Sequence, residues 1–380
     1  MAPGAPSDED AAPDETYMAP DGPSCWIAST AAAPYRLAGE VPVGLDPEGI
    51  AVDRRTGLAY VTCSRSNAVA VVDTDAMTVV ATVPVGIEPI DIAIDHRTGR
   101  VFTADARSDQ VSVIDVATHR VEATVAVGSY PAGLCVDEES RRLYCGDAVG
   151  STMSVVDVDR LERVAAVEAE LGAGAVAADT RHGRVYCVNF VASTVTVVDA
   201  GDLSVLARIP LRQGPCAVGV DPVGGDVYVA DSLASTVTRI DGSRSEVTAE
   251  MPVPNAPVGL TVGVAGDRVY VANRGDGTVS VLGLDGREWS RIPVGTAPGG
   301  VTEDPRRPGR LLVANAGAGT ITVVDDLLTG PPAAAVESVA HPLVGRPLPI
   351  VPLADLWTEE LRDLGEWAGR KYVVNVFASW

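Results

Sequence analysis

Carboxylate side chains gather in two short turn segments, GLDPEG at residues 44–49 and GIEPID at residues 86–91. The four carboxylates are Asp46, Glu48, Glu88 and Asp91. Such a group can hold a divalent cation through its oxygen atoms, or it can bind a cationic ligand. The alternative is a solvated acidic rim without a ligand.

Tyr130 and three arginines accompany these carboxylates. Tyr130 belongs to a third segment of the same kind, GSYPAG at residues 128–133. Arg65, Arg107 and Arg274 are expected to project over the same face, where they could neutralise the carboxylates or bind an anion. The eight residues form a candidate ligand site, and the four carboxylates are its candidate metal ligands. A divalent cation is the only cofactor that the sequence suggests.

The three segments belong to a repeat with a period of 42 residues. One series of that period is an aspartate that closes an apolar stretch, at Asp53, Asp95, Asp137, Asp179 and Asp221. A second series is aromatic, at Tyr60, Phe102, Tyr144, Tyr186, Tyr228 and Tyr270. Because independent series share one period, the chain contains successive copies of one structural unit, and we count seven.

Each repeat contains four short stretches rich in β-branched residues, separated by turn residues. In the first repeat they are GIAVD, LAYVTC, AVAVVD and TVVATVPVG. Four antiparallel strands in a unit of about 40 residues are typical of a β-propeller blade. We therefore predict an all-β fold, a seven-bladed β-propeller of four-stranded blades over residues 35–330, with the candidate site at the channel mouth of blades 1–3.

The segment YRLAGEVPVG at residues 35–44 aligns with the last strand of a repeat, although it precedes the first complete repeat. After Asp325 the chain departs from the repeat before a fourth strand is made. We therefore predict that residues 35–44 complete the last blade, which would leave no open sheet edge.

Histidine and cysteine positions bear on the chemistry. His96, His119 and His182 are expected on the face opposite the candidate site, so neither a catalytic triad nor a histidine-ligated metal is supported there. Cys145 and Cys187 take a strand position that other repeats fill with Val or Thr, so both are expected in the core. At the position of Cys63 the other repeats carry Asp or Asn, namely Asp105, Asp147, Asn189, Asp231, Asn273 and Asn315. These short polar side chains are expected to satisfy backbone groups of the following turn. A reactive thiol at Cys63 is the minor alternative.

The repeated Tyr-Val motifs, such as 60–63, 228–231 and 270–273, together with PVGxxP turns, resemble the YVTN family of β-propeller repeats. This resemblance implies a seven-bladed propeller and leaves function open.

After a linker at 331–340, residues 341–380 resemble the start of thioredoxin-like thiol–disulfide oxidoreductases, through VGRPLP and VVNVFASW. The CxxC pair that the chemistry of that family needs is not present, so the segment is expected to be a redox-inactive, truncated module, or else an unrelated extension.

Charge excludes some partners. With 29 basic and 51 acidic residues the net charge is −22, which disfavours binding to nucleic acid and to anionic membranes. No apolar run is long enough for a membrane span.

Residues 1–34 are acidic and are expected to be a disordered tail. They contain no secretory signal as written, which favours a cytoplasmic setting, or an extracytoplasmic one if the true N-terminus differs.

These observations favour a non-catalytic propeller that binds a small molecule or a protein on its channel face, as a binding or scaffold module. One alternative is a fragment of a propeller–thioredoxin fusion that acts as a thiol–disulfide oxidoreductase, which codons for Cys-x-x-Cys after Trp380 would reveal. The other is a metal-assisted lyase or lactonase, similar in architecture to virginiamycin B lyase.

Overall fold

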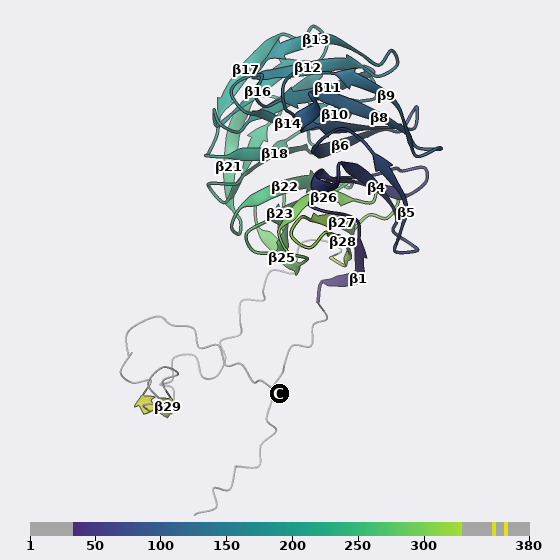
Figure 1. Cartoon of the computed structure of the whole chain (residues 1–380). Helices are drawn as coiled ribbons and strands as arrows, with labels where there is room; N and C mark the ends of the chain where they lie inside the picture. Colours follow the sequence, from purple (N-terminus) through teal and green to yellow (C-terminus); the bar gives the residue numbers. More distant parts are fainter. Residues whose placement is uncertain (1–32, 329–351, 355–360, 364–380) are drawn as a thin grey trace, which may run out of the picture.

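The computed structural model describes residues 33–328, 352–354 and 361–363 (Figure 1). Residues 35–326 form seven four-stranded antiparallel sheets. The innermost strand of each sheet contacts that of the next, and the last contacts the first, so the sheets form a closed ring. The predicted all-β seven-bladed propeller is confirmed. The predicted tail, linker and thioredoxin-like segment lie outside the described residues, except for residues 33–34 and a short strand pair, β29 (Pro352–Ala354) and β30 (Leu361–Asp363).

Successive strands of each blade run from the channel outward. Blade 1 comprises β2 (Pro47–Val52), β3 (Leu58–Cys63), β4 (Ala68–Asp73) and β5 (Thr78–Pro84). Blade 2 comprises β6 (Pro89–Asp95), β7 (Arg100–Asp105), β8 (Gln110–Asp115) and β9 (Arg120–Ala126). Blade 3 comprises β10 (Pro131–Asp137), β11 (Arg142–Asp147), β12 (Thr152–Asp157) and β13 (Glu162–Glu168). Blade 4 comprises β14 (Ala173–Asp179), β15 (Arg184–Asn189), β16 (Thr194–Asp199) and β17 (Val205–Pro210). Blade 5 comprises β18 (Pro215–Val220), β19 (Val227–Asp231), β20 (Thr236–Asp241) and β21 (Glu246–Pro252). Blade 6 comprises β22 (Pro257–Val262), β23 (Arg268–Asn273), β24 (Thr278–Gly283) and β25 (Glu288–Pro293).

Blade 7 is built from both ends of the propeller. Its inner strands are β26 (Pro298–Glu303), β27 (Arg310–Asn315) and β28 (Thr320–Asp326), and its outer strand is β1 (Tyr35–Pro42). β1 pairs antiparallel with β28, from Tyr35 opposite Asp326 to Pro42 opposite Thr320. In Figure 1 the two strands lie side by side at the base of the ring. The predicted closure by residues 35–44 is therefore confirmed.

The core is divided among the blade interfaces. Seven clusters of buried apolar residues each combine side chains from two neighbouring blades. The repeated aromatic residues of the second strands are at most 1% exposed, and blade 7 has Leu312 at this position. Because most other core residues are Val, Ile or Ala, one large side chain for each blade fills the space between small faces. Among the described residues, no helix is long and apolar enough to cross a membrane.

Arginines at the start of the second strand connect blades 2, 3, 4 and 6 to the blade that follows. In three blades the guanidinium donates to a backbone carbonyl 58 residues later; the pairs are Arg100 with Val158, Arg142 with Ala200, and Arg184 with Gly242. Blade 5 has Asp226 at this position, and there Arg239 on the third strand donates to Asp226 and to the carbonyl of Leu284 in blade 6. In blade 6, Arg268 donates to the side chain of Asp326 and to the carbonyl of Leu328, and it also pairs with its neighbour Asp267. We did not foresee this inter-blade contact from the sequence.

Candidate functional site

The turns that lead into the innermost strands share one backbone conformation. Asp46, Glu88 and Tyr130 occupy the same position in three of them, each with a φ of 57°. Their carbonyl oxygens accept backbone hydrogen bonds from the loop between the second and third strands of the blade that follows; the donors are Ser64, Ala106 and Ala148. Turn and loop of each blade therefore form one surface at the channel mouth.

Glu48 and Arg274 form an ion pair on this surface. Arg274 follows β23 in blade 6, and its terminal nitrogens lie 3.2 and 3.1 Å from Oε2 and Oε1 of Glu48. Burial raises the pKa of Glu48, the pairing with Arg274 offsets part of that rise, and nearby Asp46 adds to it. A Cβ atom at Gly299 would lie 2.8 Å from Oε2 of Glu48, so glycine at this position gives the carboxylate its space.

Glu88, Arg107 and Tyr130 form a second group over blades 1 to 3. Nε of Arg107, in the short helix η2 (Ala106–Ser108), lies 2.5 Å from Oε2 of Glu88. The Tyr130 hydroxyl donates to Oε1 of Glu88 at 2.9 Å. Burial raises the pKa of Tyr130, and the bond to Glu88 adds to this rise. Arg65, in η1 (Ser64–Ser66), is exposed and forms no ion pair with the described residues.

The four carboxylates suggested as metal ligands are not gathered into one site. Among the described residues, no three Asp, Glu, His or Cys side chains are placed to share a metal ion. The physical reason is that three of the four, all except Asp46, point to different neighbours. Glu48 pairs with Arg274, Glu88 pairs with Arg107, and Asp91 turns toward β10.

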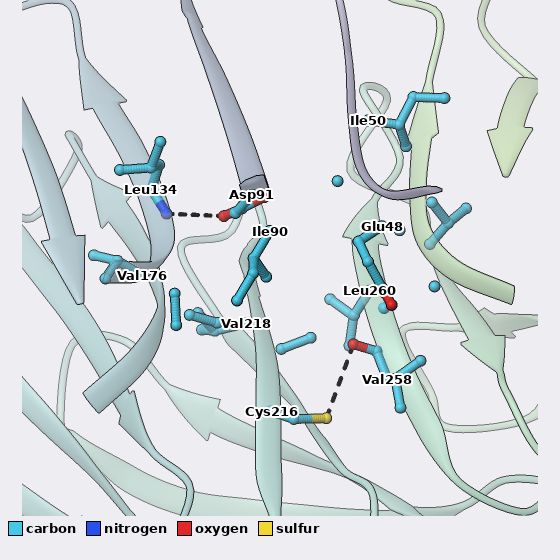
Figure 2. A pocket seen from close by; sticks show the side chains of 18 residues that line it. Glu48, Ile50, Ile90, Asp91, Leu134, Val176, Cys216, Val218, Val258 and Leu260 are labelled. Carbon is cyan, nitrogen blue, oxygen red and sulfur yellow. Dashed lines mark hydrogen bonds between the residues drawn. The ribbon is translucent and has the colours of Figure 1, made fainter. Parts of the chain in front are cut away.

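A cavity of about 270 Å³ lies on the propeller axis. All seven innermost strands line it, and Figure 2 shows their side chains around it. Because each innermost strand is paired on one side only, its free backbone edge faces this channel. All seven blades therefore contribute to the surface of this cavity.

The channel wall combines apolar, small and acidic side chains. Large apolar residues line most of it: Ile50, Ile90, Leu134, Val176, Val218, Val258, Leu260 and Val301. Glu48 takes the position that other blades fill with Ile90, Ala132, Gly174, Cys216, Val258 or Gly299. The ionisable residues of the wall are Glu48, Asp91 and Cys216.

Asp91 lies on β6 and is partly accessible from the channel. Its Oδ2 accepts a hydrogen bond of 2.8 Å from the backbone N–H of Leu134 on β10 (Figure 2). Burial raises the pKa of Asp91 to about 6, in spite of backbone donors that act in the opposite direction. The carboxyl therefore changes charge close to neutral pH.

Cys216 is a channel residue that the sequence reasoning missed. Its thiol contacts the carbonyl oxygen of Pro257 at 3.3 Å and that of Val258 at 3.9 Å. Figure 2 shows the thiol turned toward Val258. Burial raises its pKa to about 11, so the thiol is neutral and is not activated as a nucleophile. Cys216 lies four 42-residue periods after Glu48, so the repeat alone could have placed it in the channel.

The Asp and Asn residues that end the second strands are structural, as predicted, but their partners differ from those predicted. Asp147 accepts hydrogen bonds from the hydroxyls of Thr152 and Ser154 on the adjacent strand, both at 2.8 Å. It also accepts from the N–H of Gly128 in the preceding turn, at 3.1 Å. The following turn is not involved, because the side chain points across the blade toward the third strand. The hydroxyl partners on the third strand lie five or seven residues after each Asp or Asn.

The preceding turn explains an unpaired acceptor in blade 6. Oδ1 of Asn273 is buried and has no partner among the described residues. The backbone position that serves this atom in blades 2 to 4 is occupied by Pro254, which has no N–H to donate.

Replacing Asp231 by Asn is expected to stabilise the protein by about 1–2 kcal/mol at pH 8. Burial raises the pKa of Asp231 to about 6, so its ionisation costs stability as the pH rises from about 4 to 6. Asn189, Asn273 and Asn315 show that an amide suits this position. Urea unfolding at pH 8 and pH 4 measures the effect, which should vanish at pH 4. Asn273→Asp is the reverse control and should lose stability at pH 8; a destabilised Asp231→Asn at pH 8 would contradict the interpretation.

The remaining histidines and cysteines lie where the sequence placed them. His96, His119 and His182 are in turns at the end of the blades away from the channel mouth. Cys145 and Cys187 are completely buried in core clusters. The alternative of a reactive Cys63 is wrong, because Cys63 is 1% exposed and burial raises its pKa to about 11.

Exposed apolar side chains also lie on the channel face. In blades 3 to 5 they are Val149, Leu171, Phe190, Val191 and Leu233, which are 42–68% exposed, and in blades 1 and 2 they are Leu45 and Ile87. The loops 148–151, 190–193 and 232–235 contain no ionisable residue, whereas the turns that lead into blades 4 and 5 carry Glu170 and Arg212. Exposed apolar surface at a channel mouth is typical of a face that contacts a ligand or partner.

The YNCE-like beta-propeller family matches residues 41–264, which is more than half of the chain. The chain belongs to this family. The match supports the seven-bladed architecture that the YVTN-type repeats predicted, whereas the thioredoxin resemblance of residues 341–380 stays a prediction.

Solved structures show the same fold for this YNCE-like propeller. Hydrazine synthase from Kuenenia stuttgartiensis is similar with a TM-score of 0.68, over 79% of this chain and 99% of that chain. The sequence identity is 18%, so the similarity carries the fold alone. No curated protein matches the sequence.

Proposed function

We propose that this YNCE-like propeller is a non-catalytic binding module whose ligand is a small molecule held in the central channel. The observation that carries the proposal is the axial cavity lined by all seven blades, with two carboxylates among side chains that are otherwise apolar or small. Pockets of this character, apolar with a few placed polar groups, are typical ligand sites. A volume of about 270 Å³ suits a compact ligand.

The structure favours binding over the two catalytic alternatives. A metal-assisted lyase needs a ligand set, and the described residues do not provide three metal-binding side chains together. The thiol–disulfide reaction depends on residues beyond the propeller, and the channel thiol of Cys216 is not activated. At 18% identity, the similarity to hydrazine synthase gives no support to a shared activity.

A channel-filling variant tests the proposal. Ala132→Trp places a large side chain in the cavity at a position where other blades carry Ile90 and Val258, so the fold should accept it. In a thermal-shift screen of small organic compounds, we expect compounds that raise the melting temperature of the wild type and of Ala132→Ser but not of Ala132→Trp. If every stabilising compound acts equally on all three proteins, the channel is not the binding site.

A further inference from the structure

We propose that the channel ligand is a small organic cation, whose ammonium group pairs with Asp91 while its apolar body contacts the surrounding wall. This inference rests on the proposed function and names the chemical class of the ligand. It follows from the position of Asp91 in the repeat, from the charge of the channel and from the apolar residues around it.

Asp91 is the exception among seven equivalent positions. The other blades carry Gly or Ala there, namely Gly49, Gly133, Ala175, Ala217, Gly259 and Gly300. The Leu134 N–H that Asp91 binds has counterparts in the other blades, such as Val176 and Leu260, which are built without such a carboxylate. The propeller fold therefore does not require an acid at this position.

The charge of the channel is unbalanced in favour of a cation. Of the two carboxylates on the wall, Glu48 is already paired with Arg274. Asp91 has no ion-pair partner among the described residues and is anchored by backbone N–H groups, those of Leu134 and Ile92. An ionised carboxylate that is largely withdrawn from water gains most from a partner of opposite charge. The net charge of −22 also attracts cations toward the protein.

The wall near Asp91 supplies apolar contacts for the rest of the ligand. Ile90, Leu134, Val176 and Val218 line the same cavity (Figure 2). A cavity of about 270 Å³ lies just below the range of about 300–1,000 Å³ for drug-sized ligands. A compact amine with a single ring meets both the size and the polarity of this space.

Binding should depend on pH through Asp91. The other ionisable groups that face it are Glu48 on β2 and the thiols of Cys135 on β10 and Cys145 on β11. Burial raises the pKa of Cys135 to about 12 and that of Cys145 well above its usual value, so both thiols stay neutral. Because burial raises the pKa of Asp91 to about 6, a cation should bind about tenfold more weakly at pH 5 than at pH 8.

Benzylamine and benzyl alcohol are suitable probes, since they differ little in shape but only the amine is charged. By calorimetry at pH 8, we expect benzylamine to bind the wild type about 10- to 100-fold more tightly than benzyl alcohol, as a charge-assisted hydrogen bond would give. Asp91→Asn should remove this preference for the amine. Asp91→Gly should remove it as well, and this variant should fold normally because four other blades have Gly at the equivalent position.

The outcomes separate the two proposals. If benzyl alcohol binds as tightly as benzylamine and Ala132→Trp abolishes both, the channel binds ligands but the cation inference is overturned. If benzylamine binds equally to wild type and Asp91→Gly, or does not bind the wild type at all, the inference is also overturned. Failure of the proposed function itself is shown separately, by the compound screen with Ala132→Trp.

Discussion

Removal of residues 35–42 is expected to lower the melting temperature of the propeller by more than about 10 °C, the equivalent of at least about 5 kcal/mol for a domain of this size. β1 is the outer strand of blade 7, and it joins the first residues of the ring to the last. Without it, β28 becomes an open edge that invites association with other chains. Thermal unfolding by circular dichroism and size-exclusion chromatography measure the two effects.

Point variants in β1 separate closure from chain shortening. Val41 is 2% exposed and packs in the core cluster between blades 7 and 1, whereas Leu37 in the same strand is 52% exposed. Val41→Asp should destabilise strongly, because it buries an unpaired charge. Leu37→Asp is the matched control and should change stability little. Equal melting temperatures for the two variants would show that the strand is not needed for closure.

Replacement of Arg268 by Met is expected to cost about 3–5 kcal/mol of unfolding free energy. Arg268 is 8% exposed and donates to Oδ2 of Asp326 at 2.7 Å, which joins blade 6 to blade 7. Its guanidinium also lies 5.2 Å from the ring centroid of Trp289. The variant leaves Asp326 buried, with the Tyr270 hydroxyl at 3.1 Å but without its positive partner. Chemical denaturation at pH 7 measures the loss.

A second substitution identifies the source of that loss. In Arg268→Met/Asp326→Asn no buried charge remains, so at least half of the lost stability should return. Arg100→Met is the matched control, because Arg100 makes the equivalent inter-blade contact to a neutral carbonyl, and its acidic partner Glu122 is partly exposed rather than buried. This variant should cost about 1 kcal/mol. If the double variant is no more stable than Arg268→Met, lost packing rather than the unpaired charge explains the effect.

The repeat made the fold predictable to the level of individual strands. Each blade is specified by a local pattern of β-branched residues and turns, and the pattern recurs seven times, so every copy supports the interpretation of the others. Closure by β1 was predictable for the same reason, since residues 35–44 match the outer strand of a repeat.

The site was predictable only in part. The periodicity placed Glu48, Glu88 and Tyr130 at the channel mouth, because equivalent positions of a repeat lie at equivalent places in a ring. The periodicity also suggested that the acidic side chains form one cluster, whereas in the structure Glu48 and Glu88 pair with different arginines. Cys216 was overlooked because a small residue at a channel position carries no motif, although its register with Glu48 was available.

The sequence by itself determined the blade number, the strand order, the ring closure and the use of small residues in the core, since these depend on patterns within one repeat or between matching repeats. Only the tertiary structure decided which carboxylates are paired. Arg274 and Glu48 are 226 residues apart and belong to different blades, so no local pattern records their contact. The same is true of Asp91, whose lack of a positive partner depends on what the other blades bring to the channel. Charge pairing around a closed ring is a property of side chains from several blades, and it is this pairing that distinguishes Glu48 from Asp91 on the channel wall.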